Sequence, residues 1–257
     1  MPLVFRLGLI KSLPPCVITR KTAIFFLDVT DVESVKNAVS KIKAQHGRLD
    51  VLVNNAGYGI GGFFEDLTQD EIRSQMETNF FGVQNVTREV LPLMREQKHG
   101  LIINISSISG LAAWPCFGAY NASKWALEGF SESLFYELMP FGIKVCLIEP
   151  GVYRTKIFYE NRKYATNFFN HDSPYYKTSQ IFQKRLNDHI KANDRDPEEV
   201  AATVEKLINS ENPSFRNIPD SRSRLLYAVR RFLPFRLFSW IAAKVLYTPE
   251  KSNKEKR

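Results

Sequence analysis

Tyr120 and Lys124 are the residues whose types and spacing most directly suggest chemistry. They lie four positions apart in a segment with helical periodicity, so the phenol and the ammonium project from one face of a helix. A nearby positive charge favours the phenolate and moves a tyrosine, whose free pKa is about 10, toward the range of a general acid or base. Ser107, thirteen positions upstream, supplies a hydroxyl that could polarise a carbonyl. Together the three residues predict proton transfer coupled to carbonyl or alcohol chemistry.

Alternating strand and helix patterns would position these residues. Four short, largely apolar runs predict buried parallel strands: residues 23–27, 50–53, 101–105 and 144–148. Helical periodicity fills the intervals, with capping-box spacing at Thr30/Glu33 and at Thr68/Glu71. This alternation predicts an α/β fold, a Rossmann-like doubly wound parallel sheet with helices on both faces.

Three turn segments follow predicted strands directly. They are residues 54–57, 106–109 and 150–155. The helix that carries Tyr120 follows the second segment and is expected to end near Pro140 and Gly142. Ligands of open parallel sheets bind at the carboxyl ends of the strands, so the three segments are expected to face one crevice.

Composition and charge limit the class of protein. An apolar content of 44% over 257 residues is enough to bury the core of one large α/β domain. Cys16, Cys116 and Cys146 are odd in number and lack metal-ligand spacing, which indicates buried, reduced thiols in an intracellular protein. The four histidines form no clustered pattern, so no metal site is expected.

The net charge of +8 belongs to the C-terminal end of the chain. Residues 222–257 carry ten Lys/Arg and two Glu, so the first 221 residues are neutral overall and no nucleic-acid surface is indicated across them. We therefore expect one domain over 1–221, with a helix over about 197–209, and a basic, aromatic extension over 222–257. Two interpretations of the extension stay open: a helix that covers the substrate pocket, and peripheral contact with a membrane. No run reaches about 20 apolar residues, so a cytoplasmic location is expected, with membrane association as the alternative.

With these motifs the chain resembles the short-chain dehydrogenase/reductase family of nicotinamide-dependent enzymes. The resemblance runs from about Phe25 to Ala201, and its motifs occur in the family's order. The motifs are Asp28-Val29, Asn54-Asn55-Ala56-Gly57, Asn79, Ser107, Tyr120-x-x-x-Lys124, Pro150-Gly151 and Thr155. The resemblance implies an oxidoreductase that uses NAD or NADP to interconvert an alcohol and its ketone or aldehyde. It also implies a homo-oligomer, because the family commonly forms dimers or tetramers.

The resemblance assigns a role to each motif. Tyr120 would be the general acid/base, and Lys124 would lower its pKa and hold the nicotinamide ribose. Ser107 would hydrogen-bond the substrate oxygen, and Asn79 would hold a water in a proton relay to Lys124. The cofactor-binding residues would be Tyr120 and Lys124 together with Asp28, Val29, Asn55, Ala56, Gly57, Pro150, Gly151, Val152 and Thr155. Two alternatives stay open: Asp28 as a turn residue only, and Ser106 or Ser109 in place of Ser107.

One motif of the family is absent from the sequence. The family's first strand leads into a glycine-rich turn that wraps the cofactor's pyrophosphate, whereas this chain has no glycine between Gly8 and Gly47. The first βαβ unit is therefore expected to be largely missing. Three explanations stay open: a native chain that starts further upstream, a truncated or replaced N-terminus in a non-catalytic relative that serves as a binding module, or a sheet edge rebuilt by residues 3–10 and 16–19. The chain is expected to bind NAD(P)H weakly, and a choice between NAD and NADP is not readable.

Apolar and aromatic residues are expected to flank the substrate. They are Tyr58, Phe63, Phe64, Leu111, Trp114, Phe117, Tyr153, Phe158 and Tyr159. A pocket lined in this way favours a small hydrophobic alcohol or carbonyl compound over a sugar, while core or lid packing is the alternative role for these side chains.

Overall fold

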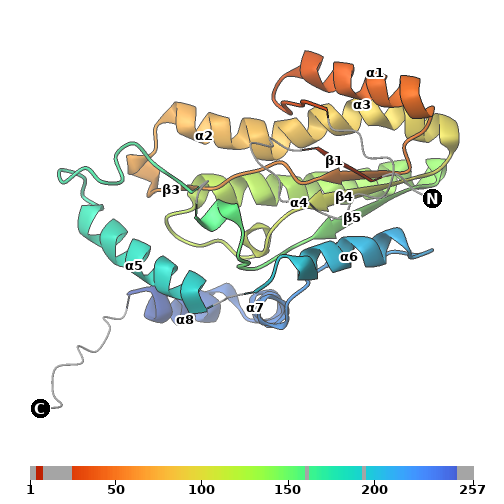
Figure 1. Cartoon of the computed structure of the whole chain (residues 1–257). Helices are drawn as coiled ribbons and strands as arrows, with labels where there is room; N and C mark the ends of the chain where they lie inside the picture. The colour runs from red at the N-terminus through yellow and green to blue at the C-terminus, as the bar shows by residue number, and fades with distance from the viewer. Residues whose placement is uncertain (1–3, 8–24, 160–161, 193–194, 248–257) are drawn as a thin grey trace, which may run out of the picture.

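A parallel sheet forms the centre of the molecule (Figure 1). The computed structural model describes residues 4–7, 25–159, 162–192 and 195–247. Five strands pair in the order β1-β2-β4-β5-β7, and every pairing is parallel. The strands are β1 (Val4–Leu7), β2 (Val51–Asn54), β4 (Gly100–Ile105), β5 (Ile143–Ile148) and β7 (Arg216–Asn217).

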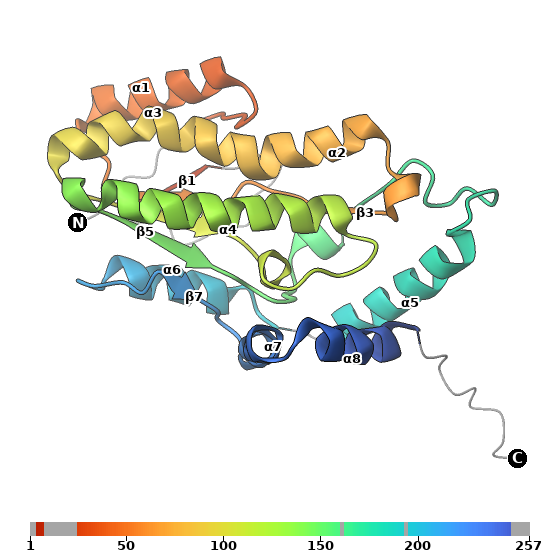
Figure 2. The ribbon, with the colours of Figure 1, turned by 180° about the vertical axis from the view of Figure 1, so that it is seen from behind.

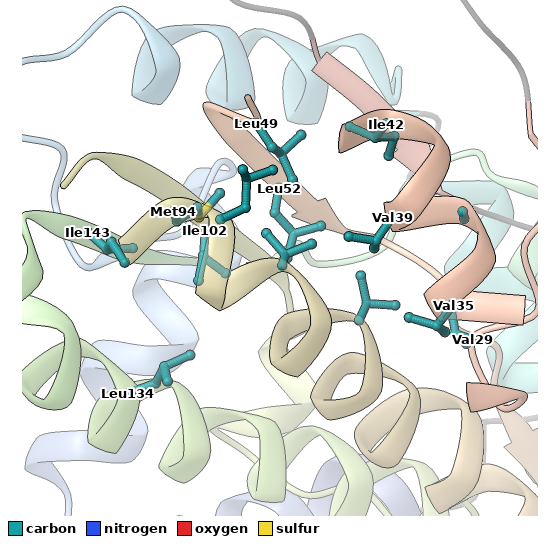
Figure 3. Packing of buried hydrophobic residues seen from close by; sticks show 14 of the residues in the cluster. Val29, Val35, Val39, Ile42, Leu49, Leu52, Met94, Ile102, Leu134 and Ile143 are labelled. Carbon is teal, nitrogen blue, oxygen red and sulfur yellow. The ribbon is translucent and has the colours of Figure 1, made fainter. Parts of the chain in front are cut away.

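Helices cover both faces of this sheet, as the doubly wound fold requires. Alternate residues of β2 and β4 point to opposite faces because the side-chain period of a strand is two. Leu52 and Ile102 pack into a core with α1 (Val32–His46), α3 (Gly82–Gln97) and α4 (Gly118–Leu138), which is drawn in Figure 3. Val51, Val53 and Ile103 pack on the other face against α6 (Glu198–Ile208). The predicted α/β class is confirmed.

The predicted strands match the observed ones at three of four places. Runs 50–53, 101–105 and 144–148 coincide with β2, β4 and β5 within one residue. The prediction of a strand over 23–27 is wrong for residues 25–27, which have extended or irregular backbone without strand pairing. Among the described residues, β1 forms the edge of the sheet beside β2. Residues 25–27 therefore have no neighbouring strand to which their backbone groups could hydrogen-bond.

The edge strand β1 bears on the explanations for the missing glycine-rich turn. Its residues pair with β2 in parallel register, from Val4 beside Val51 to Leu7 beside Asn54. The hypothesis that residues 3–10 rebuild the sheet edge is thus confirmed over 4–7. Its second part, residues 16–19, and the glycine-poor stretch that surrounds it lie outside the described residues.

Capping at the helix starts differs from the prediction at one position. Thr68 and Glu71 form the expected reciprocal capping box at α2 (Gln69–Met76). At α1 the cap is Asp31, whose carboxylate accepts from the backbone N–H of Glu33, rather than Thr30. The hydroxyl of Thr30 donates instead to Asp28, a local side-chain bond that competes with the capping role.

The C-terminal third contains more regular structure than its sequence indicated. The helix predicted over 197–209 is confirmed as α6. Two further elements, α5 (Tyr176–Ala192) and β7, were not predicted from the sequence. A second, two-stranded sheet joins β3 (Ile60–Gly61) to β6 (Lys163–Tyr164). The extension forms α7 (Ser221–Phe232) and α8 (Phe235–Tyr247).

The described residues contain neither a membrane-spanning helix nor a cluster of metal-binding side chains. Within these residues no helix combines the length and the apolar character needed to cross a bilayer. Over the same part of the chain, no group of three or more His, Cys, Asp or Glu side chains is arranged to hold a metal ion. The described cysteines, Cys116 and Cys146, are buried free thiols.

Candidate active site at the carboxyl edge of the sheet

Ser107, Tyr120 and Lys124 meet where β4 ends and α4 begins. Ser107 lies two residues beyond β4, is buried, and receives a hydrogen bond from the backbone N–H of Ser109 at 3.1 Å. The phenol of Tyr120, in the first turn of α4, lies close enough to the hydroxyl of Ser107 for that hydroxyl to lower the pKa of the phenol. Lys124, one turn further along the helix, places its Nζ 5.8 Å from the centroid of the Tyr120 ring. The structure thus brings together the three residues that the sequence selected.

The environment of Tyr120 differs from the sequence expectation. Burial raises the pKa of the phenol above its ordinary value, and the hydroxyl of Ser107 acts in the opposite direction. The sequence predicted that Lys124 would lower this pKa, but burial outweighs any such effect here. Tyr120 therefore keeps its proton at neutral pH, which suits a group that donates a proton to a carbonyl oxygen.

The ammonium of Lys124 is buried and held in one direction. Its Nζ donates to the carbonyl oxygen of Ile105, the last residue of β4, at 2.8 Å. Burial lowers the pKa of Lys124 to about 8, while the charge of Glu128 opposes that shift. A lysine with this pKa and a fixed orientation can hold or release a proton near the phenol under mildly alkaline conditions.

Asn79 occupies an irregular position in the helix that precedes α3. A π-helical turn over Glu77–Phe81 lies between α2 and α3. The buried amide of Asn79 donates to the carbonyl of Tyr58 at 3.0 Å and to the hydroxyl of Ser123 at 3.1 Å, and accepts from the N–H of Tyr58 at 3.1 Å. Such turns are frequent at functional sites. Ser123 neighbours Lys124, so the amide reaches the helix that carries the site.

The turn after β2 approaches this cluster through a glycine. A Cβ built on Gly57 would lie 3.2 Å from Oδ1 of Asn79 and 3.9 Å from Nζ of Lys124. Asn54 at the end of β2 is anchored by hydrogen bonds from its amide to Asn104 and Thr87. The close approach of the backbone at Gly57 therefore depends on the absence of a side chain and on a fixed strand end.

Val29, Asn55 and Ala56 lie together beside that turn. They line one small pocket with Asn54, Thr78, Gly82, Val83 and Val86. Val29 reaches it because a Cβ on Gly82 would stand only 2.6 Å from a methyl of Val29. Val29, Asn55 and Ala56, which the resemblance assigns to cofactor binding, thus share one surface.

Asp28 behaves as the turn residue that the sequence left as an alternative. Its carboxylate accepts from the backbone N–H of Thr30 at 2.9 Å and from the hydroxyl of Thr30 at 2.7 Å. Its backbone N–H donates to the hydroxyl of Ser34 at 3.0 Å. One carboxylate oxygen is thus committed to the local turn, and binding of a ligand by Asp28 stays a prediction.

The loop after β5 is hydrogen-bonded to the turn that follows β4. The carbonyl of Pro150 accepts from the N–H of Ile108 at 3.0 Å and from the hydroxyl of Ser107 at 3.5 Å. The N–H of Gly151 donates to the carboxylate of Asp220 at 3.2 Å, and a Cβ on Gly151 would meet Ser223 at 2.3 Å. The loop continues through Val152 to Thr155, and both are partly exposed.

Sequence reasoning missed Asp220, which ties the start of α7 to this loop. Asp220 is buried, caps α7 by accepting from the N–H of Ser223 at 2.8 Å, and holds Gly151 with its second oxygen. The Asp-x-x-Ser spacing is the signal that would have found the cap. Its contact with Gly151 depends on the tertiary fold, so only the structure reveals it.

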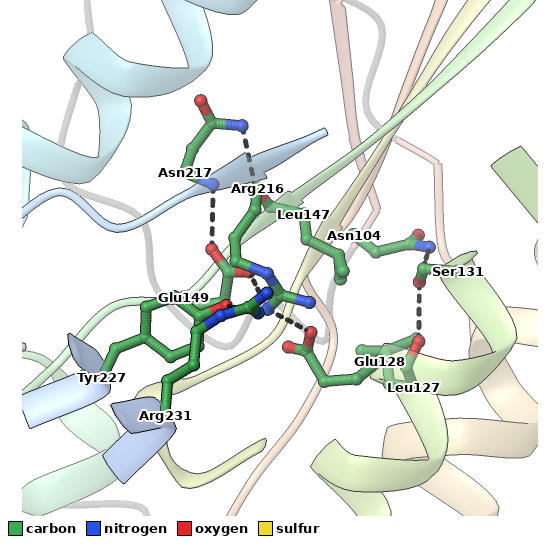
Figure 4. Close-up of polar contacts among 10 residues, drawn as sticks. All are labelled: Asn104, Leu127, Glu128, Ser131, Leu147, Glu149, Arg216, Asn217, Tyr227 and Arg231. Carbon is green, nitrogen blue, oxygen red and sulfur yellow. Dashed lines mark hydrogen bonds and ion pairs between the residues drawn. The ribbon is translucent and has the colours of Figure 1, made fainter. Parts of the chain in front are cut away.

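A buried charge cluster behind Lys124 was also missed. Arg216 of β7 donates to the carboxylates of Glu128 and Glu149, each at 2.6 Å (Figure 4). Glu149 directly follows β5 and is fully buried, and Glu128 lies one turn after Lys124 on α4. The charge of Glu128 also acts on Lys124. An acidic residue directly after the largely apolar strand 143–148 was the available signal.

We expect this cluster to make stability depend on pH. Burial and the neighbouring charge of Glu128 raise the pKa of Glu149 to about 8, against the lowering effect of Arg216. An unfolded glutamate titrates near pH 4.3, so between about pH 4.3 and 8 the folded state binds more protons, and its stability falls as pH rises through that window. Melting temperatures measured from pH 5 to 8 should fall less steeply in Glu149→Gln than in the parent. Exposed Glu137→Gln is the matched control; equal slopes for the parent and Glu149→Gln would contradict the prediction.

Apolar residues expected around a substrate divide into two groups. Phe117 packs edge-on against Tyr120 with ring centroids 6.4 Å apart, and it also contacts Phe182 of α5 at 5.8 Å. Tyr153, in contrast, is 2% exposed and donates its hydroxyl to Glu199 of α6 at 3.1 Å, so it serves packing. Phe64 is 79% exposed and stands in solvent.

Comparison with known proteins agrees with the geometry. Residues 9–165 match the family model described as short chain dehydrogenase. A relative from Bacteroides thetaiotaomicron, named 3-ketodihydrosphingosine reductase, is 40% identical over 228 residues, which are 88% of this chain and 83% of that protein. A relative from Bacillus subtilis, named as the uncharacterized oxidoreductase YusZ, is 38% identical over 86% of this chain and 79% of its own.

Comparison with solved structures points to the same family. A short-chain dehydrogenase from Streptomyces avermitilis is 34% identical, with a TM-score of 0.70 over 85% of this chain and 76% of its own. ElxO, solved with NADP bound, is 27% identical with a TM-score of 0.61 over 77% of each chain. The family model and these relatives cover the segment that carries Asn79, Ser107, Tyr120 and Lys124. The chain therefore belongs to the short-chain dehydrogenase/reductase family of oxidoreductases.

Proposed function

We propose that this protein interconverts a hydrophobic alcohol and its carbonyl form with NAD or NADP, using Tyr120 as the general acid/base. The observation that carries the proposal is the arrangement of three side chains at one strand end. The phenol of Tyr120 lies beside Ser107, and Lys124 is buried one helical turn away with its Nζ fixed on the carbonyl of Ile105. Family membership and relatives named as oxidoreductases support the same activity.

The residues present fit the nicotinamide and ribose part of such a cofactor. The backbone at Gly57 comes close to Asn79 and Lys124 because no side chain intervenes. Lys124 would hold the ribose hydroxyls, and the Pro150–Thr155 loop would line the nicotinamide. Val29, Asn55 and Ala56 share the surface proposed for the adenine end. A bound nicotinamide would supply or accept the hydride.

The chain's own residues handle the proton. The raised pKa of Tyr120 keeps the phenol protonated, so it can donate to a carbonyl oxygen that also accepts from Ser107. The pKa of Lys124, about 8, allows that ammonium to lose a proton near the phenol, and Asn79 lies close enough to its helix to hold a bridging water. In the oxidation direction the same groups remove the alcohol proton.

The substrate proposal rests on the surface beside the phenol. Phe117 lies against Tyr120 and Phe182, and Phe63 stacks on Tyr175 with centroids 4.8 Å apart. Such a surface favours an apolar chain over a sugar. The name of the Bacteroides relative, 3-ketodihydrosphingosine reductase, supports a keto compound of lipid character.

A turnover assay tests this proposal. The protein is incubated with millimolar NADH or NADPH and either long-chain ketones or small polar ketones, and loss of the reduced nicotinamide is followed by its absorbance. We expect turnover of long-chain ketones at a kcat/KM at least about tenfold above that of polar ones, because each buried methylene adds affinity. Turnover of polar ketones alone would contradict the substrate class, and no turnover of any carbonyl would contradict the activity.

Cofactor affinity is expected to be low for this 257-residue polypeptide. A glycine-rich turn normally lets backbone N–H groups wrap the pyrophosphate, and no glycine stands between Gly8 and Gly47. Titration of NADH and NADPH, followed by the quenching of tryptophan fluorescence, should give a Kd above about 100 µM, because the pyrophosphate lacks its usual backbone donors. A micromolar Kd for this chain would contradict the prediction. If neither cofactor binds at any concentration, the alternative of a non-catalytic binding module is favoured.

A further inference from the structure

We propose that α7 and α8 bind the surface of an anionic phospholipid bilayer. Exposed apolar side chains of the two helices would enter the interfacial layer while arginine and lysine side chains meet the headgroup phosphates. Figures 1 and 2 show the two helices at one end of the molecule, with α8 beside α5 and away from α1 and α3. Residues 221–247, which comprise both helices and their connection, are called the C-terminal helix pair below.

Charge is the first observation that points to an anionic surface. The C-terminal helix pair contains six Lys/Arg and no Asp or Glu. The cations are Arg222, Arg224, Arg230, Arg231, Arg236 and Lys244. Cations near an anionic membrane are each attracted by its negative surface potential, and six of them over 27 residues form a concentrated basic segment.

Exposed apolar side chains are the second observation. Six large hydrophobic residues of the C-terminal helix pair are between 39% and 78% exposed: Leu225, Phe232, Phe235, Leu237, Trp240 and Ile241. In α8, Leu237, Trp240 and Ile241 follow the i, i+3, i+4 spacing of one helix face, and Phe238 is buried on another. Leu225 and Phe232 likewise lie seven positions apart on α7. Each helix is therefore amphipathic, with its apolar stripe directed to the outside.

Cations and aromatic rings lie together on these stripes. Nζ of Lys244 stands 3.9 Å from the ring centroid of Trp240, one turn away on the exposed face of α8. The guanidinium of Arg230 lies 5.4 Å from the rings of Phe235 and Phe238, and so connects the two helices. Basic residues beside Trp and Phe on an amphipathic helix are the composition that binding in a membrane interface requires.

Other occupants fit this surface less well. Nucleic acid would be held by the cations, but burial of six large apolar side chains gives it no advantage. A second copy of this chain would place one basic helix pair against another, and like charges repel. If these helices covered the substrate pocket, their apolar side chains would face inward, whereas these six residues face solvent. The chemistry that satisfies both the apolar stripe and the positive charge is an anionic lipid surface.

Vesicle co-sedimentation of the full chain tests the proposal. The vesicles contain either phosphatidylcholine alone or phosphatidylcholine with 30% phosphatidylserine, in 0.15 M salt. We expect binding to the anionic vesicles and at least about tenfold weaker binding to the neutral ones. The double variants Arg224→Glu/Arg236→Glu and Phe232→Ser/Trp240→Ser should each weaken binding to anionic vesicles by about tenfold or more.

Two matched variants control for non-specific effects. Arg73→Glu/Arg88→Glu reverses two exposed charges on α2 and α3, and Phe64→Ser removes an aromatic side chain as exposed as Phe232. Both should bind anionic vesicles within about twofold of the parent, with circular dichroism showing that every variant is folded. Failure of the folded parent to bind, or equal losses in the controls, would overturn the proposal. The proposal would also be overturned by a different occupant of this surface. That result would be binding to duplex DNA, or self-association, that competes with vesicle binding and is lost in Phe232→Ser/Trp240→Ser.

Discussion

Replacing Tyr120 with phenylalanine is expected to lower kcat for carbonyl reduction by about 10²–10⁴-fold, the usual contribution of a positioned general acid. Phenylalanine keeps the ring that packs against Phe117 and removes only the hydroxyl that lies beside Ser107. The KM for the cofactor should change little, because Lys124 keeps its bond to the carbonyl of Ile105. Initial rates at saturating ketone and millimolar cofactor provide the measurement.

Tyr136 offers the matched control on the same helix. It is 61% exposed and lies in α4, sixteen positions beyond Tyr120. Tyr136→Phe should leave kcat unchanged, and both variants should melt at the parent's temperature. A Tyr120→Phe protein that reduces the ketone at the parent's rate would remove Tyr120 from the mechanism.

Arg216→Met is expected to destabilise the fold by about 3–5 kcal/mol, the cost of leaving buried charges without their partner. Arg216 stands between two carboxylates whose side chains are 9% and 0% exposed, those of Glu128 and Glu149. Methionine preserves much of the side-chain volume but neutralises neither carboxylate. The melting temperature should fall by roughly 6–20 °C, given the usual conversion for a chain of this size. Differential scanning calorimetry at pH 9, above the pKa of about 8 of Glu149, measures the shift while both carboxylates of the parent are charged.

A control pair separates loss of the buried network from loss of any arginine. Arg48→Met removes an exposed guanidinium that pairs with Asp50, and the melting temperature should barely change. Adding Glu128→Gln and Glu149→Gln to Arg216→Met should restore part of the stability, since two neutral amides no longer need a cation. Equal melting temperatures for Arg216→Met and Arg48→Met would contradict the account of this network.

The sequence predicted the site because its signals are local. Tyr120 and Lys124 share a helix face through their four-residue spacing, and Ser107 and Pro150 each follow an apolar run that became β4 or β5. Parallel strands bring their carboxyl ends to one edge, so residues far apart in the chain could be grouped without coordinates. The capping box at Thr68 was predictable for the same local reason.

Features that depend on partners distant in the sequence were not predictable. The run at 23–27 has strand composition, but residues 25–27 lack a neighbouring strand, and β1 at 4–7 occupies the edge beside β2 instead. The direction of the pKa shift of Tyr120 depends on how deeply α4 buries the phenol. Arg216 lies 67 positions beyond Glu149, and no spacing rule links them.

Hydride transfer itself provides the most direct test of the proposed function. NADH or NADPH carrying two deuterium atoms at C4 of the nicotinamide, so that a hydride from either face is labelled, is incubated with the protein and a long-chain ketone, and the product alcohol is examined by mass spectrometry. We predict that one deuterium appears on the carbinol carbon in the parent and that Tyr120→Phe forms the labelled alcohol at least about a hundredfold more slowly. An alcohol formed without deuterium, or equal rates in the two proteins, would contradict a nicotinamide-dependent reaction that depends on the proton of Tyr120.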